Sequence, residues 1–162
     1  MSTGPTATRL ANALTENFRP PQLAVIVPSY NERDNIELLY EKVALSLGDT
    51  PWEMIVVDDD SPDGTADVVN ELSRIYGNIR CLRRFGRRGL ASACIEGMAV
   101  TAAPYVAVID GDLQHDEAVL PTMLEKAMAG ADLVVGSRFA DGGSAGDGLS
   151  EARLSGSNLA NR

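Results

Sequence analysis

The sequence predicts an α/β fold with a doubly wound, mainly parallel sheet, and its hydrophobic pattern gives two reasons for this. Five short runs rich in valine and isoleucine recur along the chain, and strands buried on both faces have this nearly continuous apolar character. The runs lie at residues 23–27, 54–57, 79–82, 105–109 and 133–135. Patterns of helical period separate them, and alternating strands and helices are typical of a parallel sheet.

One helix is expected in each interval between these runs, because apolar residues recur there at helical spacing. Asn31 precedes the first helix and is a suitable N-cap residue. The expected apolar positions are Ile36, Leu39, Tyr40, Val43 and Leu47 in the first helix, Val68, Val69, Leu72, Ile75 and Tyr76 in the second, Ala93, Cys94, Gly97 and Met98 in the third, and Val119, Leu120, Met123, Leu124, Ala127 and Met128 in the fourth.

The chain is expected to form one domain, since 162 residues can bury a core without disulfide bonds. We expect residues 1–20 to be a flexible N-terminal segment and residues 21–162 to form the domain. Four glycines predict a mobile loop at residues 139–150, and residues 151–162 look like the beginning of another helix. Because no closing element follows, we expect a fragment whose C-terminal part is missing.

The composition excludes several classes of partner and site. With 14 basic and 23 acidic residues the net charge is −9, which argues against nucleic acid and against general adhesion to anionic lipid. No apolar run reaches the roughly 18 residues of a membrane span, so we expect a cytoplasmic chain, peripheral at most to the cytoplasmic face of a membrane. Cys81 and Cys94 are expected to be free thiols, and the single histidine argues against structural zinc.

Polar segments follow four of the predicted strands, where ligands bind in open parallel sheets. The segments are residues 28–32, 58–64, 110–115 and 136–138. Two of them are dense in carboxylates, and like charges crowded at one sheet edge repel unless a cation lies between them. Asp110, Asp112 and Gln114 offer the hard oxygen ligands that suit Mg²⁺ or Mn²⁺, and such an ion would hold a diphosphate.

Plainer interpretations of the polar residues remain open. Aspartates after strands also serve as helix caps and turn formers, which is the role expected for Asp63. His115 is expected to support the metal loop. Five arginines fall within nine residues and form either a solvated loop or a local phosphate site. They are Arg80, Arg83, Arg84, Arg87 and Arg88.

Several other motifs are absent from the sequence. There is no GxxxxGK followed by Ser or Thr, no GxGxxG after the first strand and no GxSxG. These absences argue against a P-loop, a dinucleotide oxidoreductase and a serine hydrolase.

The residues singled out so far resemble those of the family 2 glycosyltransferases, in particular the polyprenyl-phosphate (dolichol-phosphate) mannose synthases. The matching stretches are VPSYNE (27–32), VDDDSPDGT (57–65), GRRGLASA (86–93), IDGDLQHDE (109–117) and GSR (136–138). They occur in the family's order, and the resemblance covers residues 23 to about 157. The resemblance implies a GT-A, Rossmann-like fold and inversion at the anomeric carbon of the sugar.

The resemblance also implies roles for the matching residues. Those that would bind the donor are Pro28, Tyr30 and Glu32 in the nucleotide pocket, Asp59 at the base, Arg87 or Arg88 at the phosphates, and Asp110 and Asp112, with Gln114, at the metal and diphosphate. Those that would bind the acceptor phosphate are Arg138, Arg153 and Ser157. Arg153 and Ser157 would share one helix face. Asp112, Arg138 and Arg153 are the expected catalytic residues.

The sequence departs from the family's pattern at two internal positions. Asp60 stands where glycine is common, which affects the turn, and Ala91 replaces the second glycine of a GLG-type loop, which stiffens it.

The expected function is metal-dependent transfer of a sugar, mannose from GDP-mannose, to a polyprenyl phosphate at the membrane surface. One alternative keeps the acceptor class and takes UDP-glucose or a UDP-hexosamine as donor. A second alternative is a fragment that binds nucleotide without turnover. A third is a phosphoacceptor domain like the response-regulator receivers, but that class needs a lysine where Arg138 stands.

Overall fold

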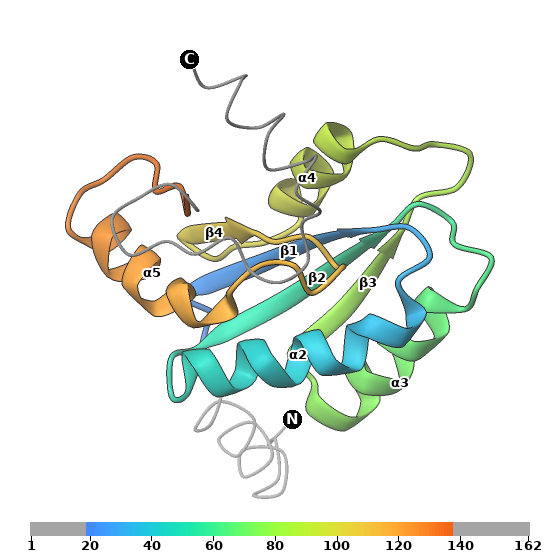
Figure 1. The fold of residues 1–162 in the computed structure, drawn as a ribbon, viewed down its shortest axis with the longest axis horizontal. Helices are drawn as coiled ribbons and strands as arrows, with labels where there is room; N and C mark the ends of the chain where they lie inside the picture. Colours follow the sequence, from blue (N-terminus) through green and yellow to red (C-terminus); the bar gives the residue numbers. More distant parts are fainter. Residues whose placement is uncertain (1–18, 138–162) are drawn as a thin grey trace, which may run out of the picture.

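The computed structural model describes residues 19–137 and shows a four-stranded parallel sheet with helices on both faces (Figure 1). In chain order the elements are β1 (Leu23–Ser29), α2 (Arg33–Leu47), β2 (Trp52–Asp58), α3 (Thr65–Tyr76), β3 (Ile79–Arg83), α4 (Leu90–Ala99), β4 (Tyr105–Val108), the 3₁₀ helix η1 (Glu117–Val119) and α5 (Leu120–Met128). The α/β fold with a doubly wound parallel sheet is therefore confirmed.

The strand order is β3-β2-β1-β4, so the direction of winding reverses once. From β1 the chain moves outward to β2 and β3, and then crosses back to the other side of β1 to form β4. The pairing of β1 runs from Leu23 opposite Trp52 to Ser29 opposite Asp58, and on its other side from Leu23 opposite Tyr105. The reversal places the carboxyl ends of β1 and β4 side by side at a topological switch point, where open α/β sheets bind their ligands.

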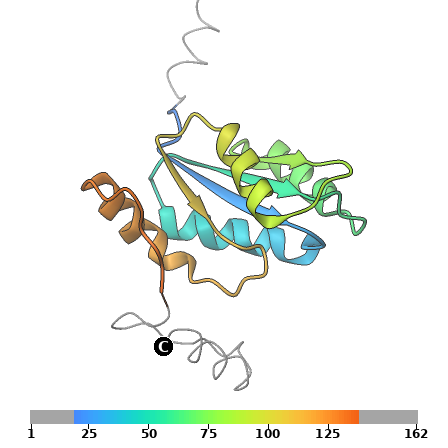
Figure 2. The same ribbon diagram turned by 90° about the horizontal axis from the view of Figure 1, so that it is seen from above.

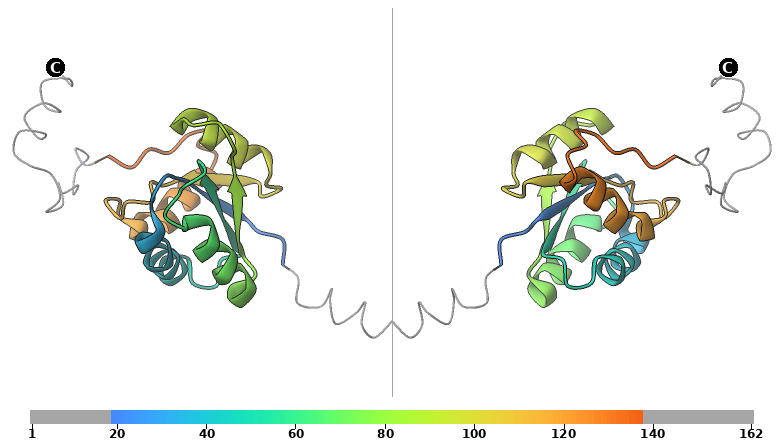
Figure 3. Two further views of the ribbon diagram at one scale, coloured as in Figure 1. Left: turned by 90° about the vertical axis from the view of Figure 1, so that its right-hand side faces the viewer. Right: turned by 90° about the vertical axis from the view of Figure 1, so that its left-hand side faces the viewer.

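The two faces of the sheet are covered unequally (Figures 2 and 3). Helices α2, α3 and α5 pack on one face and bury a large apolar cluster that includes Val25, Leu39 and Leu124. On the other face, α4 is the only helix among residues 19–137, and it packs over a small cluster that includes Ile26 and Ala93. The larger cluster supplies most of the hydrophobic stabilisation, because that stabilisation scales with the apolar area removed from water.

A glycine allows α4 to lie close to the sheet. A Cβ added at Gly97 would stand 2.5 Å from Cγ2 of Ile26 and 2.9 Å from Cγ2 of Val57. Since real side chains do not approach so closely, any larger residue at this position would push the helix away from β1 and β2.

The first four apolar runs form strands, but the prediction of a strand at 133–135 is wrong for the described structure. These residues have no strand assignment, and the side chains of Leu133 and Val135 are 80% and 72% exposed. A strand is stabilised by a paired neighbour and by contacts on its faces. Among residues 19–137 this run has no paired strand, and only Val134 is half-buried. Three apolar residues without such contacts do not determine a strand.

The predicted helix faces are confirmed in the first helix and only partly in the others. All five apolar positions predicted for α2 are buried. At the end of α3, Ile75 is 69% exposed and Tyr76 lies beyond the buried face, where Tyr76 stacks on Tyr40 with the ring centroids 4.5 Å apart. Met98, Val119 and Met128 are likewise exposed.

The N-cap prediction for Asn31 is wrong. The residue before α2 is Glu32, and Asn31 has a φ of +61°, a left-handed conformation that asparagine tolerates better than most residues. The side-chain amide of Asn35 donates a hydrogen bond to the Glu32 carboxylate at 2.7 Å. Asn31 thus turns the chain out of β1, and the N-cap residue Glu32 makes no side-chain capping hydrogen bond.

Both cysteines are free thiols, as expected. Burial raises the pKa of Cys81 to about 11, with Asp58 adding to the shift, so this thiol is neutral at physiological pH. None of the helices in the described part of the chain is long and apolar enough to cross a membrane. The predicted loop at 139–150, the predicted helix at 151–162 and residues 1–18 of the N-terminal segment lie outside the described residues.

Candidate functional site

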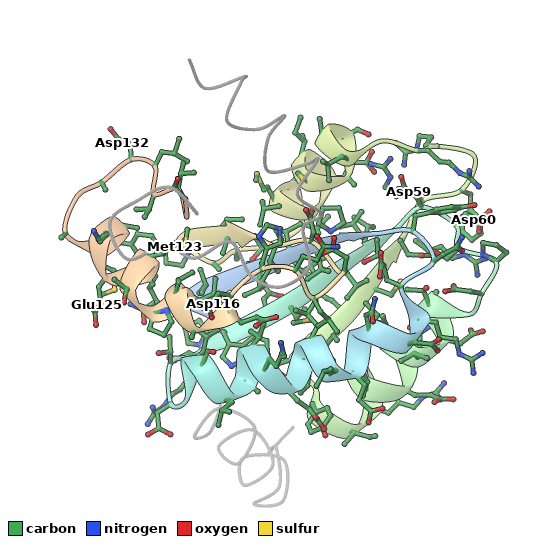
Figure 4. All side chains as sticks on the ribbon, in the orientation of Figure 1. Asp59, Asp60, Asp116, Met123, Glu125 and Asp132 are labelled. Carbon is green, nitrogen blue, oxygen red and sulfur yellow. The ribbon has the colours of Figure 1, made fainter. Side chains whose placement is uncertain are left out.

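The segments that follow the strands meet at the carboxyl edge of the sheet. Asp59 and Asp60 lie just beyond the arrowhead of β2 (Figure 4). Residues 29–32 follow β1 beside them, and residues 109–112 follow β4 on the other side of β1. The sheet therefore brings together, at the switch point, three of the polar segments that the sequence marks.

The loop after β2 holds the loop after β1 in place. Three consecutive backbone N–H groups, those of residues 31–33, donate to side-chain oxygens of Ser61, Thr65 and Asp63 at 2.9, 3.1 and 3.1 Å. The short polar residues of the SPDGT stretch thus satisfy backbone donors that would otherwise be unpaired at the start of α2. Their role in the structure is to position the 29–32 segment.

Two aspartates, Asp58 and Asp63, accept hydrogen bonds from other residues of the loop after β2. Asp58 is fully buried and accepts hydrogen bonds from the hydroxyl of Ser61 and from its N–H, the latter at 3.1 Å. Asp63 accepts from the N–H of Thr65 at 2.9 Å and from its hydroxyl at 2.6 Å. Desolvation raises the pKa of Asp63, but the hydrogen bonds from Thr65 and Arg33 outweigh it, so the pKa lies below its ordinary value. The turn-forming role expected for Asp63 is confirmed.

Asp60, the departure from a common glycine, adopts a φ of +58°. Aspartate tolerates this left-handed conformation better than most residues do, which explains how the turn survives the substitution. Its carboxylate pairs with Arg83 at 2.6 Å, and both side chains are about 40% exposed. Ala91, the second departure, is the second residue of α4 rather than part of a loop, so its methyl group favours the helix.

The Asp110–Gly111–Asp112 segment lies against the end of β1. A Cβ added at Gly111 would stand 3.1 Å from Cγ of Glu32 and 3.4 Å from Oγ of Ser29. Glycine at this position therefore lets the two aspartates approach the 29–32 segment closely, as the nucleotide pocket implied by the resemblance requires.

The side chains of this segment are oriented by the residues that follow it. His115 Nε2 lies 3.1 Å from Asp110 Oδ2, so the histidine contacts one of the two aspartates that are predicted to bind the metal. The N–H of Gln114 donates to Asp112 Oδ1 at 3.1 Å, and Leu113 between them has a φ of +60°. Each aspartate therefore has one oxygen engaged within the loop and one directed elsewhere.

The donor chemistry of this loop fits a magnesium or manganese ion, although the protein ligands are few. Within residues 19–137 no three histidine, cysteine or acidic side chains are grouped as a metal site. Mg²⁺ does not need such a group, because it is commonly bound by one or two carboxylates together with water and substrate phosphates. Asp110 and Asp112 supply two carboxylates on an exposed loop, and Gln114 adds a neutral oxygen.

The arginines of β3 and of the segment after it are not one solvated cluster. Arg84 is 1% exposed, and its Nε lies 2.8 Å from Asp59 Oδ1, an ion pair without the alignment of a hydrogen bond. Asp59 Oδ2 accepts a hydrogen bond from the N–H of Gly89 at 2.8 Å. The sequence places Arg84 together with its exposed neighbours, and strand alternation does not single it out. Arg80 has the same parity, yet its side chain is 44% exposed.

The remaining arginines of the cluster have different partners. Arg80 pairs with Glu53 at 3.2 Å. Arg87 forms two hydrogen bonds to the Glu96 carboxylate, at 3.0 and 3.1 Å. Arg88 instead lies over the Tyr30 ring, 4.1 Å from its centroid, and donates to the Tyr30 hydroxyl at 2.8 Å. In the described part of the chain, Arg88 is thus the cluster member without a carboxylate partner.

The structure therefore gathers most of the residues marked by sequence. The predicted donor residues Pro28, Tyr30, Glu32, Asp59, Arg87, Arg88, Asp110 and Asp112 and the predicted metal ligand Gln114 all follow, or end, strands at one sheet edge. The predicted acceptor-phosphate residues Arg138, Arg153 and Ser157 lie outside the described residues.

Comparison with known sequences gives a family and two curated relatives. The model of glycosyl transferase family 2 matches residues 24–155. A dolichol-phosphate mannosyltransferase of Pyrococcus furiosus is 40% identical over 122 residues, which are 75% of this chain and 34% of that protein. A dolichol-phosphate mannosyltransferase of Saccharomyces cerevisiae is 35% identical over 126 residues, which are 75% of this chain and 46% of that protein. The chain thus spans less than half the length of these relatives.

Comparison with solved structures agrees on the architecture. A mannosyltransferase from Pyrobaculum calidifontis was solved in complex with GDP-mannose and Mn²⁺. It superposes on this chain with a TM-score of 0.50 at 26% identity, and the matched region is 66% of this chain and 34% of that protein. A glucosyl-3-phosphoglycerate synthase from Mycobacterium tuberculosis has a TM-score of 0.53 at 22% identity, covers 80% of this chain and 46% of its own, and supports the fold alone.

Proposed function

The chain belongs to glycosyl transferase family 2 and has the GT-A fold, and we propose that it carries the donor site of a metal-dependent, inverting transferase. The proposed reaction moves a sugar, mannose from GDP-mannose, to a polyprenyl phosphate. The names of the curated relatives and the GDP-mannose and Mn²⁺ bound to the Pyrobaculum structure support this choice.

One observation carries the proposal: the close approach of the two polar segments at the switch point. Gly111, between the two aspartates, lies against Glu32 and Ser29 from the end of β1. A nucleotide pocket and a diphosphate-binding loop are thereby adjacent, as transfer from a nucleoside diphosphate requires. In this arrangement Pro28, Tyr30 and Glu32 line the pocket, and Asp59 faces the base.

Asp110, Asp112 and Gln114 are the residues that would hold Mg²⁺ or Mn²⁺. A bound ion would supply positive charge to the leaving diphosphate. Arg88, which has no carboxylate partner in the described structure, is placed to add charge to the same phosphates, and Arg87 can do so only in competition with Glu96.

We propose a single in-line displacement, in which a phosphate oxygen of the acceptor forms a bond to the anomeric carbon as the bond to the nucleoside diphosphate breaks. The second pKa of a phosphate monoester is about 6, so the nucleophile is largely dianionic at neutral pH and needs no general base. Catalysis then rests on positioning and on stabilisation of charge. Arg138, Arg153 and Ser157 are proposed to hold the acceptor phosphate.

Two alternatives use the same site. A UDP-glucose or UDP-hexosamine donor would need no change in the phosphate-binding residues, because the resemblance fixes neither the base nor the sugar. Since the chain spans 34–46% of the length of its curated relatives, it could also bind donor without completing transfer.

The test is calorimetric titration of GDP-mannose, GDP and UDP, with Mn²⁺ and then with EDTA. We expect binding that depends on the metal and prefers GDP, and we expect Asp112→Ala to lose the metal-dependent part. A preference for UDP would keep the family and change the donor. Absence of binding by all three nucleotides, in a sample shown to be folded by circular dichroism, would overturn the proposal.

A further inference from the structure

Arg84 is the one charged side chain of the arginine cluster that the structure buries completely. It follows β3 directly, and its backbone N–H donates to the carbonyl of Asp58 at 2.8 Å. Its side chain runs beneath residues 85–89, here called the arginine loop, toward α4. A guanidinium so placed cannot contact solvent, so the groups around it determine what it does.

The guanidinium of Arg84 joins three separate segments of the chain. Its Nε lies 2.8 Å from Asp59 after β2. Its terminal nitrogens contact the carbonyl of Gly89 at 3.5 Å, and the Ser92 hydroxyl at 3.0 Å and the Glu96 carboxylate at 3.5 Å on α4. The two carboxylates compensate the buried charge, which would otherwise strongly destabilise the fold.

The arginine loop depends on these contacts, because both of its ends have glycine geometry. Gly86 has a φ of +67° and Gly89 a φ of +138°, so neither end is confined by a Cβ. The Gly89 end is fixed by the hydrogen bond from its N–H to Asp59 and by the contact of its carbonyl with Arg84. Arg84 and Asp59 therefore act together as the anchor of the loop.

The loop carries the arginines that face the proposed donor site. Arg87 is held by Glu96, the same carboxylate that approaches Arg84, and Arg88 reaches across to Tyr30. Displacement of the Arg84 guanidinium would alter the position of Asp59 and of both arginines at once. The buried ion cluster of Arg84, Asp59 and Glu96 is thus linked to the proposed donor site. Stability alone does not require such a cluster, because apolar residues can fill a buried position equally well.

We infer that Arg84 is a positioning residue, which fixes Asp59 and the arginine loop so that the loop presents its charge to the donor phosphates. The role of the loop at the phosphates rests on the proposed function; the anchoring of the loop does not. Arg84 itself touches no substrate, and its effect passes through Asp59, Gly89 and Glu96.

The experiment compares Arg84→Lys with Arg80→Lys in the 162-residue chain. Lysine keeps the charge but loses the planar fork that reaches several partners at once. Arg80 is a matched control, because it also pairs with a glutamate but is 44% exposed and lies away from the loop. The first measurement is amide hydrogen exchange in peptides covering residues 84–92, which needs no nucleotide. The second is the Kd for GDP with Mn²⁺, measured well below the melting temperature of each variant.

We expect Arg84→Lys to accelerate exchange in the loop, including the N–H of Gly89, and to weaken GDP binding by about tenfold, since small displacements at such sites have large effects. Arg80→Lys should change neither quantity. Unchanged exchange and unchanged Kd in folded Arg84→Lys would overturn the inference. A lowered melting temperature with normal loop exchange and normal Kd would also overturn it, because that result describes a purely structural residue.

A second variant covers the case in which Arg84→Lys does not fold. Glu96→Gln leaves the buried guanidinium in place and removes one of its two carboxylates, on the better-exposed side of the cluster. Because Glu96 also holds Arg87, the readout in this variant is the N–H of Gly89, which bonds to Asp59. Its exchange should accelerate, and a normal rate would overturn the inference. If the wild-type chain binds no nucleotide, the proposed function fails, while the exchange measurement still decides whether Arg84 anchors the loop.

Discussion

The loops that follow β2 and β3 lie side by side at the same sheet edge, but different interactions hold them. Residues 58–65 are fixed by short polar side chains, which bond to nearby backbone N–H groups and to one another. Residues 84–89 are fixed by long charged side chains, whose partners lie in the segments after β1 and β2 and in α4. The first loop is a rigid support for the pocket, and the second presents charge that a ligand can compete for.

The largest expected effect is on residues 58–65, here called the rigid loop, through the buried carboxylate of Asp58. Asp58→Ala removes the acceptor of both Ser61 hydrogen bonds and leaves those donors unpaired in a site from which water is excluded. We expect the free energy of unfolding to fall by about 3 kcal/mol. Urea denaturation measures this, with the exposed Asp49→Ala as control. A loss no larger than that of the control would show that the loop does not depend on its internal hydrogen bonds.

The second prediction compares the contributions of Arg88 and Arg87, both in the arginine loop, to GDP binding. Arg88→Gln should weaken GDP binding by about tenfold, because its charge has no carboxylate partner in the described structure. Arg87→Gln should weaken binding by about threefold or less, because Glu96 already compensates that charge. Calorimetry at two salt concentrations gives both values. The reverse order would identify Arg87 as the arginine that leaves its partner for the phosphate.

A smaller effect concerns the pH dependence of stability in the rigid loop. The pKa of folded Asp63 lies below that of the unfolded chain, so its contribution is present above the unfolded pKa and is lost as the pH falls through the folded pKa. Asp63→Asn should therefore lower the stability most near neutrality and least at low pH, which flattens the acid limb of stability against pH. Thermal melts between about pH 3 and pH 7 would show this, since the pKa of an aspartate carboxyl in the unfolded chain is about 3.9. An unaltered acid limb would count against the hydrogen-bonding role of Asp63.

The smallest expected effect lies where the two loops touch. Asp60→Gly relieves the left-handed backbone but loses an ion pair with Arg83 that is about 40% exposed. Exposed pairs contribute little, and glycine gains freedom in the unfolded chain. We therefore expect a net change within about 0.5 kcal/mol, measured by urea denaturation. A loss above about 1 kcal/mol would mean that the exposed pair joins the loops more strongly than such pairs usually do.

The sequence alone predicted the four paired strands, the turn-forming role of Asp63 and the polar segments at the sheet edge, because those features depend on local chemistry. The role of Asp63 follows from the bonding habits of short polar residues, and the strands from their apolar runs. The arginine cluster could not be resolved in this way. Arg84 and Arg88 are identical in type and four residues apart, yet one is buried beside two carboxylates and the other lies over Tyr30.

The run at 133–135 and Asn31 show the same limit. An apolar run favours a strand, and asparagine favours a helix N-cap, but both are local preferences. Tertiary structure overrides them when the run has no strand to pair with or when another residue occupies the N-cap position. The sequence by itself determined the α/β class, the four paired strands and the acidic motifs, since each is encoded by residue type and short spacing. Only the tertiary structure decided which charges are buried, which are paired and which face the site, because those partners lie far apart in the chain and meet only when the sheet is assembled.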